Sequence, residues 1–348
     1  MTHADQKQRS AMLRAVLATA LIAALLVGAL VATITALNTN VYSAGGFVGQ
    51  YLNALERKDT VGALSLGGVR PRAAQLEAAG LPSDLPTTLL RASALGDLTN
   101  VTLTSDVEVQ PGKHTVVYDF DLNGQPSSMR FSVESTGTFG GVFSSWRFAT
   151  SPVAALAVEV QHESIFTVNG LTLDTRAHAE ADAPASFTNA ATYLAFAPSV
   201  YTFRHDTTLL NAAAVPVPVT KTGVIDVVVD AVPNAVFVDQ VQVELNEFLD
   251  AQCITQTVLQ PTGCRFGMDI DNRVLSAPTW TMAAYPEVTL TPGETSFEMP
   301  QTEGLAHLVV EVQSLFDGSI ETRDEDVPFT MGLSVAIQPS GALAIQLR

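Results

Sequence analysis

The stretch AVLATALIAALLVGALVATITAL, residues 15–37, decides how the rest of this chain is organised. No charged residue lies between Arg14 and Glu56, and as a helix residues 15–37 would be roughly 35 Å long at ~1.5 Å per residue. That length crosses the ~30 Å hydrocarbon core of a membrane with some tilt. We therefore predict a transmembrane helix at residues 15–37, followed by a short polar linker at residues 38–46.

A cleaved signal peptide is the alternative interpretation of this stretch. The apolar core of a signal peptide is usually about 7–15 residues long and ends at a small-x-small site. The run here is longer, and its best exit sites have Ile34 or Tyr42 where a small residue is required. The pattern favours an uncleaved anchor, and either interpretation places the bulk of the protein outside the cytoplasm.

The distribution of charge predicts how the helix is oriented in the membrane and which classes of binding partner are compatible with the protein. Lys7, Arg9 and Arg14 precede the apolar run, against Asp5 alone among acidic residues. The positive-inside rule then predicts a cytoplasmic tail at residues 1–14 and a single-pass protein of the cell membrane whose remainder is extracellular. The net charge of −17 over 348 residues repels nucleic acid and anionic headgroups, so we expect no nucleic-acid partner. It favours cations, basic proteins or neutral polymers.

Residues 46–150 change from a helical pattern to a strand pattern. Near their start, apolar residues recur at helical spacing, at Phe47, Val48, Tyr51, Leu52 and Leu55. From Thr99 the period becomes two, and Asn123-Gly124 is a strong hairpin signal. Helices followed by an antiparallel meander predict an α+β domain at residues 46–150.

This order of elements resembles a known superfamily. The helix YLNALERKDTVGALSL (residues 51–66), followed by a meander that ends in a strand bearing Trp146, resembles the nuclear-transport-factor-2-like (cystatin-like cone) α+β proteins. The resemblance implies a cone with an interior pocket, for which Tyr118 and Trp146 are the candidate lining residues. Tyr118 lies on the apolar face of its strand, which favours a core tyrosine. The fold hosts enzymes, carriers and structural modules, so it fixes no function.

The remainder divides into an all-β piece and a second helix-plus-sheet piece. Residues 151–235 carry strand patterns and a second hairpin signal at Asn169-Gly170, with Pro152 opening a linker, so we predict a small all-β module there. Residues 236–348 begin with an amphipathic helix and continue as strands. Because this repeats the order of residues 46–150, we predict a second cone-like α+β domain on the other side of the module.

The whole plan is similar to that of the teicoplanin-resistance-associated membrane proteins of Gram-positive bacteria. Those proteins have one spanning helix followed by small repeated extracellular domains. The segment from LDAQC (residues 249–253) to PTGCRF (residues 261–266) resembles a cysteine-bearing helix exit in such envelope proteins. The family usually carries a cytoplasmic zinc ribbon, whereas residues 1–14 here contain no cysteine. The resemblance implies a cell-wall polymer or an envelope protein as partner.

The chemistry of the sequence is sparse. Cys253 and Cys264 lie close in sequence and outside the cytoplasm, which predicts a disulfide. A metal site is the disfavoured alternative, because no histidine lies nearby and two thiolates make a poor zinc site. The six histidines show no HExxH spacing, and no GxSxG motif occurs. We therefore expect no metal, no cofactor and no enzymatic activity.

The sequence is compatible with two functions. The first is a non-catalytic, membrane-anchored extracytoplasmic protein that binds an envelope component, whether protein, wall polymer or small ligand. The alternative is a small-molecule or lipid carrier, or an enzyme, that uses the cone cavity of the first α+β domain. An open cavity at Tyr118 and Trp146 would favour the alternative, and a filled core would favour the first function.

Overall fold

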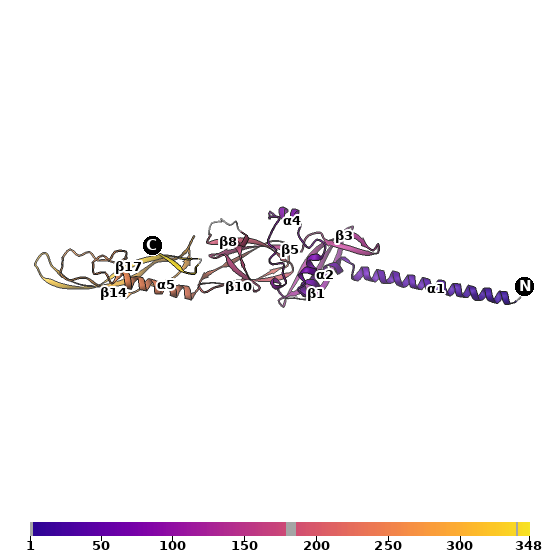
Figure 1. Cartoon of the computed structure of the whole chain (residues 1–348), viewed down its shortest axis with the longest axis horizontal. Coiled ribbons are helices and arrows are strands. Elements are labelled where there is room, and N and C mark those ends of the chain that lie inside the picture. The colour runs from indigo at the N-terminus through magenta and orange to yellow at the C-terminus, as the bar shows by residue number, and fades with distance from the viewer. Residues whose placement is uncertain (1–2, 179–185, 339) are drawn as a thin grey trace.

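A computed structural model of the chain describes residues 3–178, 186–338 and 340–348. It is a mixed α+β structure, mostly sheet with a few helices. Figure 1 shows the elements following one another along the long axis, from the N-terminal helix to the sheet that contains the C-terminus.

The N-terminal helix is α1 (His3–Asn40), which covers residues 15–37 and extends beyond them on both sides. Among the described residues, it is the one helix long and apolar enough to cross a membrane, over Val16–Asn40, and its side chains there are not buried in the protein. A signal sequence passes the same test, so the helix alone fits either interpretation.

The predicted linker at residues 38–46 is shorter than expected. Helix α1 continues to Asn40, and α2 (Ala44–Glu56) begins after only a short turn. The amides of Val41 and Tyr42 both donate to the carbonyl of Leu37, at 2.8 and 2.9 Å, which closes α1. The hydroxyl of Ser43 then accepts from the amide of Gly46 and caps α2.

The first α+β part packs α2 against an antiparallel sheet in the order β1-β2-β3-β4. Asn123-Gly124 joins β2 to β3, as its hairpin signal predicts, with positive φ at both residues. The strands are β1 (Leu98–Gln110), β2 (Lys113–Leu122), β3 (Gln125–Phe139) and β4 (Phe143–Phe148). Short helices precede them: α3 (Thr60–Ser65), α4 (Ala73–Ala78) and η1 (Ala92–Ala94).

The middle part is built from two facing sheets, in the orders β11-β5-β8 and β12-β10-β9-β6-β7. No linker follows Pro152: β5 starts at Val153 and is the central strand of its sheet, parallel to β11 and antiparallel to β8. Its run of buried aliphatic side chains explains this central place. The strands are β5 (Val153–Gln161), β6 (Ile165–Val168), β7 (Leu171–Asp174), β8 (Thr188–Phe196), β9 (Ser199–Asp206), β10 (Leu210–Val219), β11 (Gly223–Asp230) and β12 (Val232–Pro233), with the turn η2 at Thr175–His178.

The C-terminal part again places a helix before antiparallel strands. Helix α5 (Ala235–Phe248) buries Phe237, Val241 and Leu245 and continues into a π-helical turn, η3 (Leu249–Cys253). The long strand β16 lies at the centre of the sheet, in the order β13-β16-β17-β18, and also pairs with β14 and β15. The strands are β13 (Arg273–Val274), β14 (Thr279–Ala284), β15 (Thr291–Pro292), β16 (Phe297–Gln313), β17 (Ile320–Ile337) and β18 (Leu343–Leu347).

Buried side chains of the described residues form two hydrophobic clusters. One runs from Ala44 to Val229 and so joins the first α+β part to the middle sheets. The other runs from Leu209 to Val335 and fills the C-terminal part. The limits predicted at residues 150 and 235 remain predictions, because a shared cluster does not by itself place a domain boundary.

Candidate functional site

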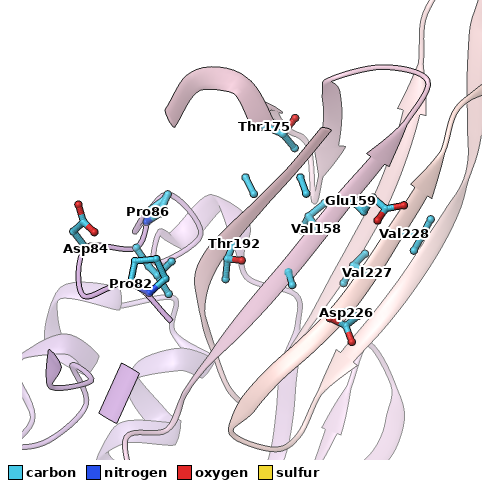
Figure 2. A pocket seen from close by; sticks show the side chains of 14 residues that line it. Pro82, Asp84, Pro86, Val158, Glu159, Thr175, Thr192, Asp226, Val227 and Val228 are labelled. Carbon is cyan, nitrogen blue, oxygen red and sulfur yellow. The ribbon is translucent and has the colours of Figure 1, made fainter. Parts of the chain in front are cut away.

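A hollow lies on the outer face of the β11-β5-β8 sheet. Along these strands the side chains alternate: Val158, Val160, Val227 and Val229 are buried, whereas the positions between them face outward. The outer face, the segment Pro82–Pro86 and Thr175 enclose a groove of about 680 Å³. Figure 2 shows that segment on one side of the groove and strands β5 and β11 on the other.

The floor of the groove is low because its side chains are small. Ala157 from β5 and Ala190, Ala191 and Thr192 from β8 line it. Such residues let another chain approach the strand backbone closely. The Pro82–Pro86 segment, which forms one wall of the groove, is held to the sheet, because the backbone amide of Leu194 on β8 donates to the carbonyl of Pro86 at 2.9 Å.

Carboxylates are the charged groups of this groove. Asp84 lies on the Pro82–Pro86 segment, Glu159 on β5 and Asp226 on β11 (Figure 2). No Lys, Arg or His is among the described residues that line the groove, and none of those described forms an ion pair with these three carboxylates. The carboxylate of Glu159 accepts a hydrogen bond from the side-chain Nε2 of Gln161 at 2.8 Å. The groove is therefore negative and lacks a counter-charge from the described chain.

A second hollow, of about 320 Å³, lies beside the groove, nearer the start of β5 and the end of β8. It is lined by apolar and uncharged residues of α4, the start of β5 and the end of β8, among them Leu76, Ala155 and Leu194. Successive positions of β5 thus line first an apolar hollow, at Ala154 and Ala155, and then the acidic groove, at Ala157 and Glu159. An extended chain that lay along this face would meet apolar surface and then negative charge.

Strand β11 is one of the two edge strands of this sheet, the other being β8. The outward residues Val224 and Val228 of β11 are exposed on either side of Asp226. An edge strand presents backbone N–H and C=O groups that can pair with an added strand. The groove and this edge together suit an extended peptide better than a compact ligand.

The structure places Tyr118 against α2. Tyr118 is buried, and its hydroxyl donates to the carbonyl of Gly45 at 2.9 Å. A Cβ added at Gly49 would lie 2.7 Å from the hydroxyl oxygen of Tyr118. Burial, and then the charge of Asp106, raises the pKa of Tyr118 above its usual value near 10. The hydroxyl thus remains a hydrogen-bond donor at neutral pH.

Trp146 lies at the junction of α1 and α2. Its indole Nε1 donates to the carbonyl of Tyr42 at 2.8 Å, and its ring lies 4.8 Å from that of His114. The residues that line the groove and the neighbouring hollow do not include Tyr118 or Trp146. A ligand cavity between these two residues stays a prediction.

Cys253 and Cys264 are joined by a disulfide, with their Cα atoms 5.7 Å apart. The bond ties the end of the π-helical turn η3 to the loop that follows it. Among the described residues, no group of three or more His, Cys, Asp or Glu side chains is arranged to hold a metal ion.

Comparison of the chain with protein-family models, curated proteins and solved structures finds no match.

The sequence patterns described above do not predict the acidic groove. The only signal was local: small or acidic residues at alternate, outward positions, namely Ala157, Glu159 and Asp226. That pattern is also typical of any solvent-facing strand. What makes it a groove is the Pro82–Pro86 segment, whose approach to β8 has no signature in the sequence.

Proposed function

We propose that this protein is a non-catalytic, membrane-anchored binding protein whose extracytoplasmic part binds an extended, positively charged segment of another envelope protein. The observation that carries the proposal is the groove on the β11-β5-β8 sheet. It combines a floor of small side chains, an edge strand and three carboxylates without a basic partner in the described chain. Lysine or arginine side chains would supply the missing counter-charge.

The anchor in this proposal is α1. Its apolar side chains face away from the protein, and Lys7, Arg9 and Arg14 precede the apolar run. These features support a single-pass helix with a cytoplasmic N-terminus. The helix also continues almost without interruption into α2. A tether of this kind keeps the groove on the outer side of the membrane, with the first α+β part between the groove and α1 (Figure 1).

The same proposal includes the fold relationships expected from the sequence. We regard residues 46–150 and 236–348 as cone-like domains, similar to the nuclear-transport-factor-2-like superfamily, in an envelope protein similar to the teicoplanin-resistance-associated proteins. The order of elements supports this, because a helix precedes antiparallel strands in both parts. Both also end in an antiparallel hairpin, β3–β4 and β17–β18.

The site geometry favours the groove over a ligand cavity in the first α+β part. Tyr118 and Trp146 both donate to backbone carbonyls, so their polar atoms hold helix junctions together. Among the described residues, the hydrogen bond from the side chain of Gln161 to Glu159 is the one polar contact recorded for the carboxylates of the groove.

A peptide selection tests the proposal. The full-length protein in lipid nanodiscs would be presented with a random peptide library, and we expect the bound peptides to be enriched in lysine and arginine. The double variant Glu159→Gln, Asp226→Asn should lose this enrichment. The single variants Glu159→Gln and Asp226→Asn are compared with Asp119→Asn, which makes the same change in net charge at an exposed position of β2 outside the groove. Enrichment that survives the double variant, or that favours acidic peptides, would refute the proposal.

A further inference from the structure

The turn between β3 and β4 exposes large apolar side chains. Phe139 is 69% exposed and Val142 is 43% exposed. Gly140 and Gly141, both with positive φ, form the turn between them. From Ser135 to Trp146 the chain carries no charged residue, although the whole protein has a net charge of −17. Phe316, in the turn after β16, is also exposed, but the tip of the β3–β4 hairpin differs from it in having no charged neighbour in sequence from Ser135 to Trp146.

The hairpin tip is fixed to the C-terminal end of α1. The side chain of Asn38 donates to the carbonyl of Val142 at 2.7 Å and accepts from the amide of Ser144 at 3.1 Å. The ring of Tyr42 stacks on that of Phe143 with centroids 4.5 Å apart. Figure 1 shows the β3–β4 hairpin beside the end of α1. The tip therefore lies at the level at which α1 leaves its apolar run.

That level is the membrane interface if α1 is the anchor. The apolar run ends at Leu37, and each interfacial layer outside the hydrocarbon core is roughly 5–8 Å thick. Asn38, the next residue, then lies in the outer interfacial layer, and its hydrogen bonds hold Val142 at the same depth. Tyrosine side chains, such as that of Tyr42, are enriched at this depth in membrane proteins, and the ring of Phe143 packs on Tyr42.

We infer that the tip of the β3–β4 hairpin, Phe139–Phe143, is a second membrane contact that inserts into the outer interface beside α1. The inference rests on the anchor of the proposed function. Continuity with α1 identifies the occupant of the apolar tip as lipid, because the lipid that surrounds the anchor is already adjacent to the tip. The absence of charge between Ser135 and Trp146 fits this environment, since the acidic surface elsewhere would be repelled from anionic headgroups.

A second contact has a consequence for the whole protein. A single helix leaves an attached domain free to rotate and tilt, whereas a helix and a hairpin joined by Asn38 and Tyr42 restrict both motions. The groove would then be presented to its partner at a defined height and direction.

A fluorescence experiment on the full chain tests this inference. Phe139→Cys would be labelled with an environment-sensitive NBD dye, and the protein reconstituted into phosphatidylcholine–phosphatidylglycerol vesicles. We expect the dye emission to shift to shorter wavelength and to be quenched by lipids that carry a spin label near the glycerol end of the acyl chain. Gln125→Cys is the matched control, because it is exposed at the opposite end of the same strand. Its dye should behave as in water.

Leu30→Cys, in the middle of the apolar run, separates the two ways to fail. If the dye at residue 30 is in lipid but the dye at residue 139 matches that at residue 125, the anchor stands and the hairpin contact is refuted. If the dye at residue 30 is also in water, α1 is not an anchor and both proposals are overturned.

Discussion

At the scale of single residues, the contact between Gly49 and Tyr118 sets how closely α2 lies on the first sheet. The hydroxyl of Tyr118 donates to the carbonyl of Gly45, and in this position it lies directly against Gly49. A side chain at residue 49 would occupy the space of that hydroxyl. The glycine is thus explained by close approach and not by backbone conformation.

Gly49→Ala should therefore destabilise the protein by about 1–3 kcal/mol, the usual cost of overpacking. This is opposite to helix propensity, which favours alanine over glycine by about 0.8–1.0 kcal/mol inside a helix. Urea unfolding would measure the difference.

The control is the same substitution in a Tyr118→Phe background. Without the hydroxyl, the nearest remaining atom is the ring Cζ at 3.6 Å, which is an ordinary contact. Gly49→Ala should then be neutral or stabilising. An equal cost in both backgrounds would show that Tyr118 is not the obstacle.

Tyr51 makes a similar hydrogen bond, in this case between the first α+β part and the middle sheets. It is fully buried on α2, and its hydroxyl donates at 2.8 Å to the carbonyl of Ala197, next to strand β8. Burial raises the pKa of Tyr51 well above its usual value near 10. One neutral side chain thus joins the first α+β part to the middle sheets.

At the scale of elements, the disulfide loop is held by more than its covalent bond. Gln256 donates to the carbonyl of Thr262 at 3.0 Å and accepts from its amide at 2.8 Å, which closes the loop from inside. The indole of Trp280 donates to the carbonyl of Val258 at 2.8 Å. The loop is therefore packed against β14 as well as cross-linked to η3.

Cys253→Ser should destabilise the C-terminal part by about 2–4 kcal/mol, because the open loop regains entropy in the unfolded state. Unfolding can be followed by Trp280 fluorescence in a Trp146→Phe background. Cys264→Ser removes the same bond at a half-buried site, whereas Cys253 is fully buried. We expect the cost at Cys253 to be the larger of the two.

Intact mass under non-reducing conditions checks the bond itself. Two free thiols in the folded protein would contradict the disulfide. Cys253→Ser should leave the unfolding midpoint of the first hydrophobic cluster unchanged, because the disulfide lies in the second cluster. If both midpoints fall together, the two clusters do not unfold independently.

At the scale of the whole molecule, every functional proposal depends on the predicted topology, in which the tail is cytoplasmic, α1 spans the membrane and the rest of the chain lies outside. The acidic groove, the apolar hairpin tip and the disulfide all lie after α1 in the chain. They can serve an envelope partner only if that part of the chain is outside.

Cysteine labelling in intact cells tests this topology. An impermeant maleimide should label Asn53→Cys, which is exposed on α2, in whole cells. It should label Thr2→Cys only after the cells are broken. The native cysteines form the disulfide and should not react. Labelling of residue 2 from outside would reverse the orientation, and a mature N-terminus after residue 36 would identify a signal peptide.

Local interactions explain what the sequence by itself determined. The apolar helix, the Asn-Gly turns at residues 123–124 and 169–170 and the disulfide each depend on residues close together in the chain. Period and turn chemistry also predicted the mixed α+β class, with helix before strands in the first and last parts.

Only the tertiary structure decided where the surfaces of interest lie. The groove needs Pro86 beside Leu194, and the hairpin tip needs Val142 beside Asn38, 104 residues away in sequence. The same packing made β5 a central strand where Pro152 had suggested a linker. Contacts between such distant residues form only when burial of the whole core compensates the entropy of closing long loops. That balance is a property of the packed chain, and no short segment carries it.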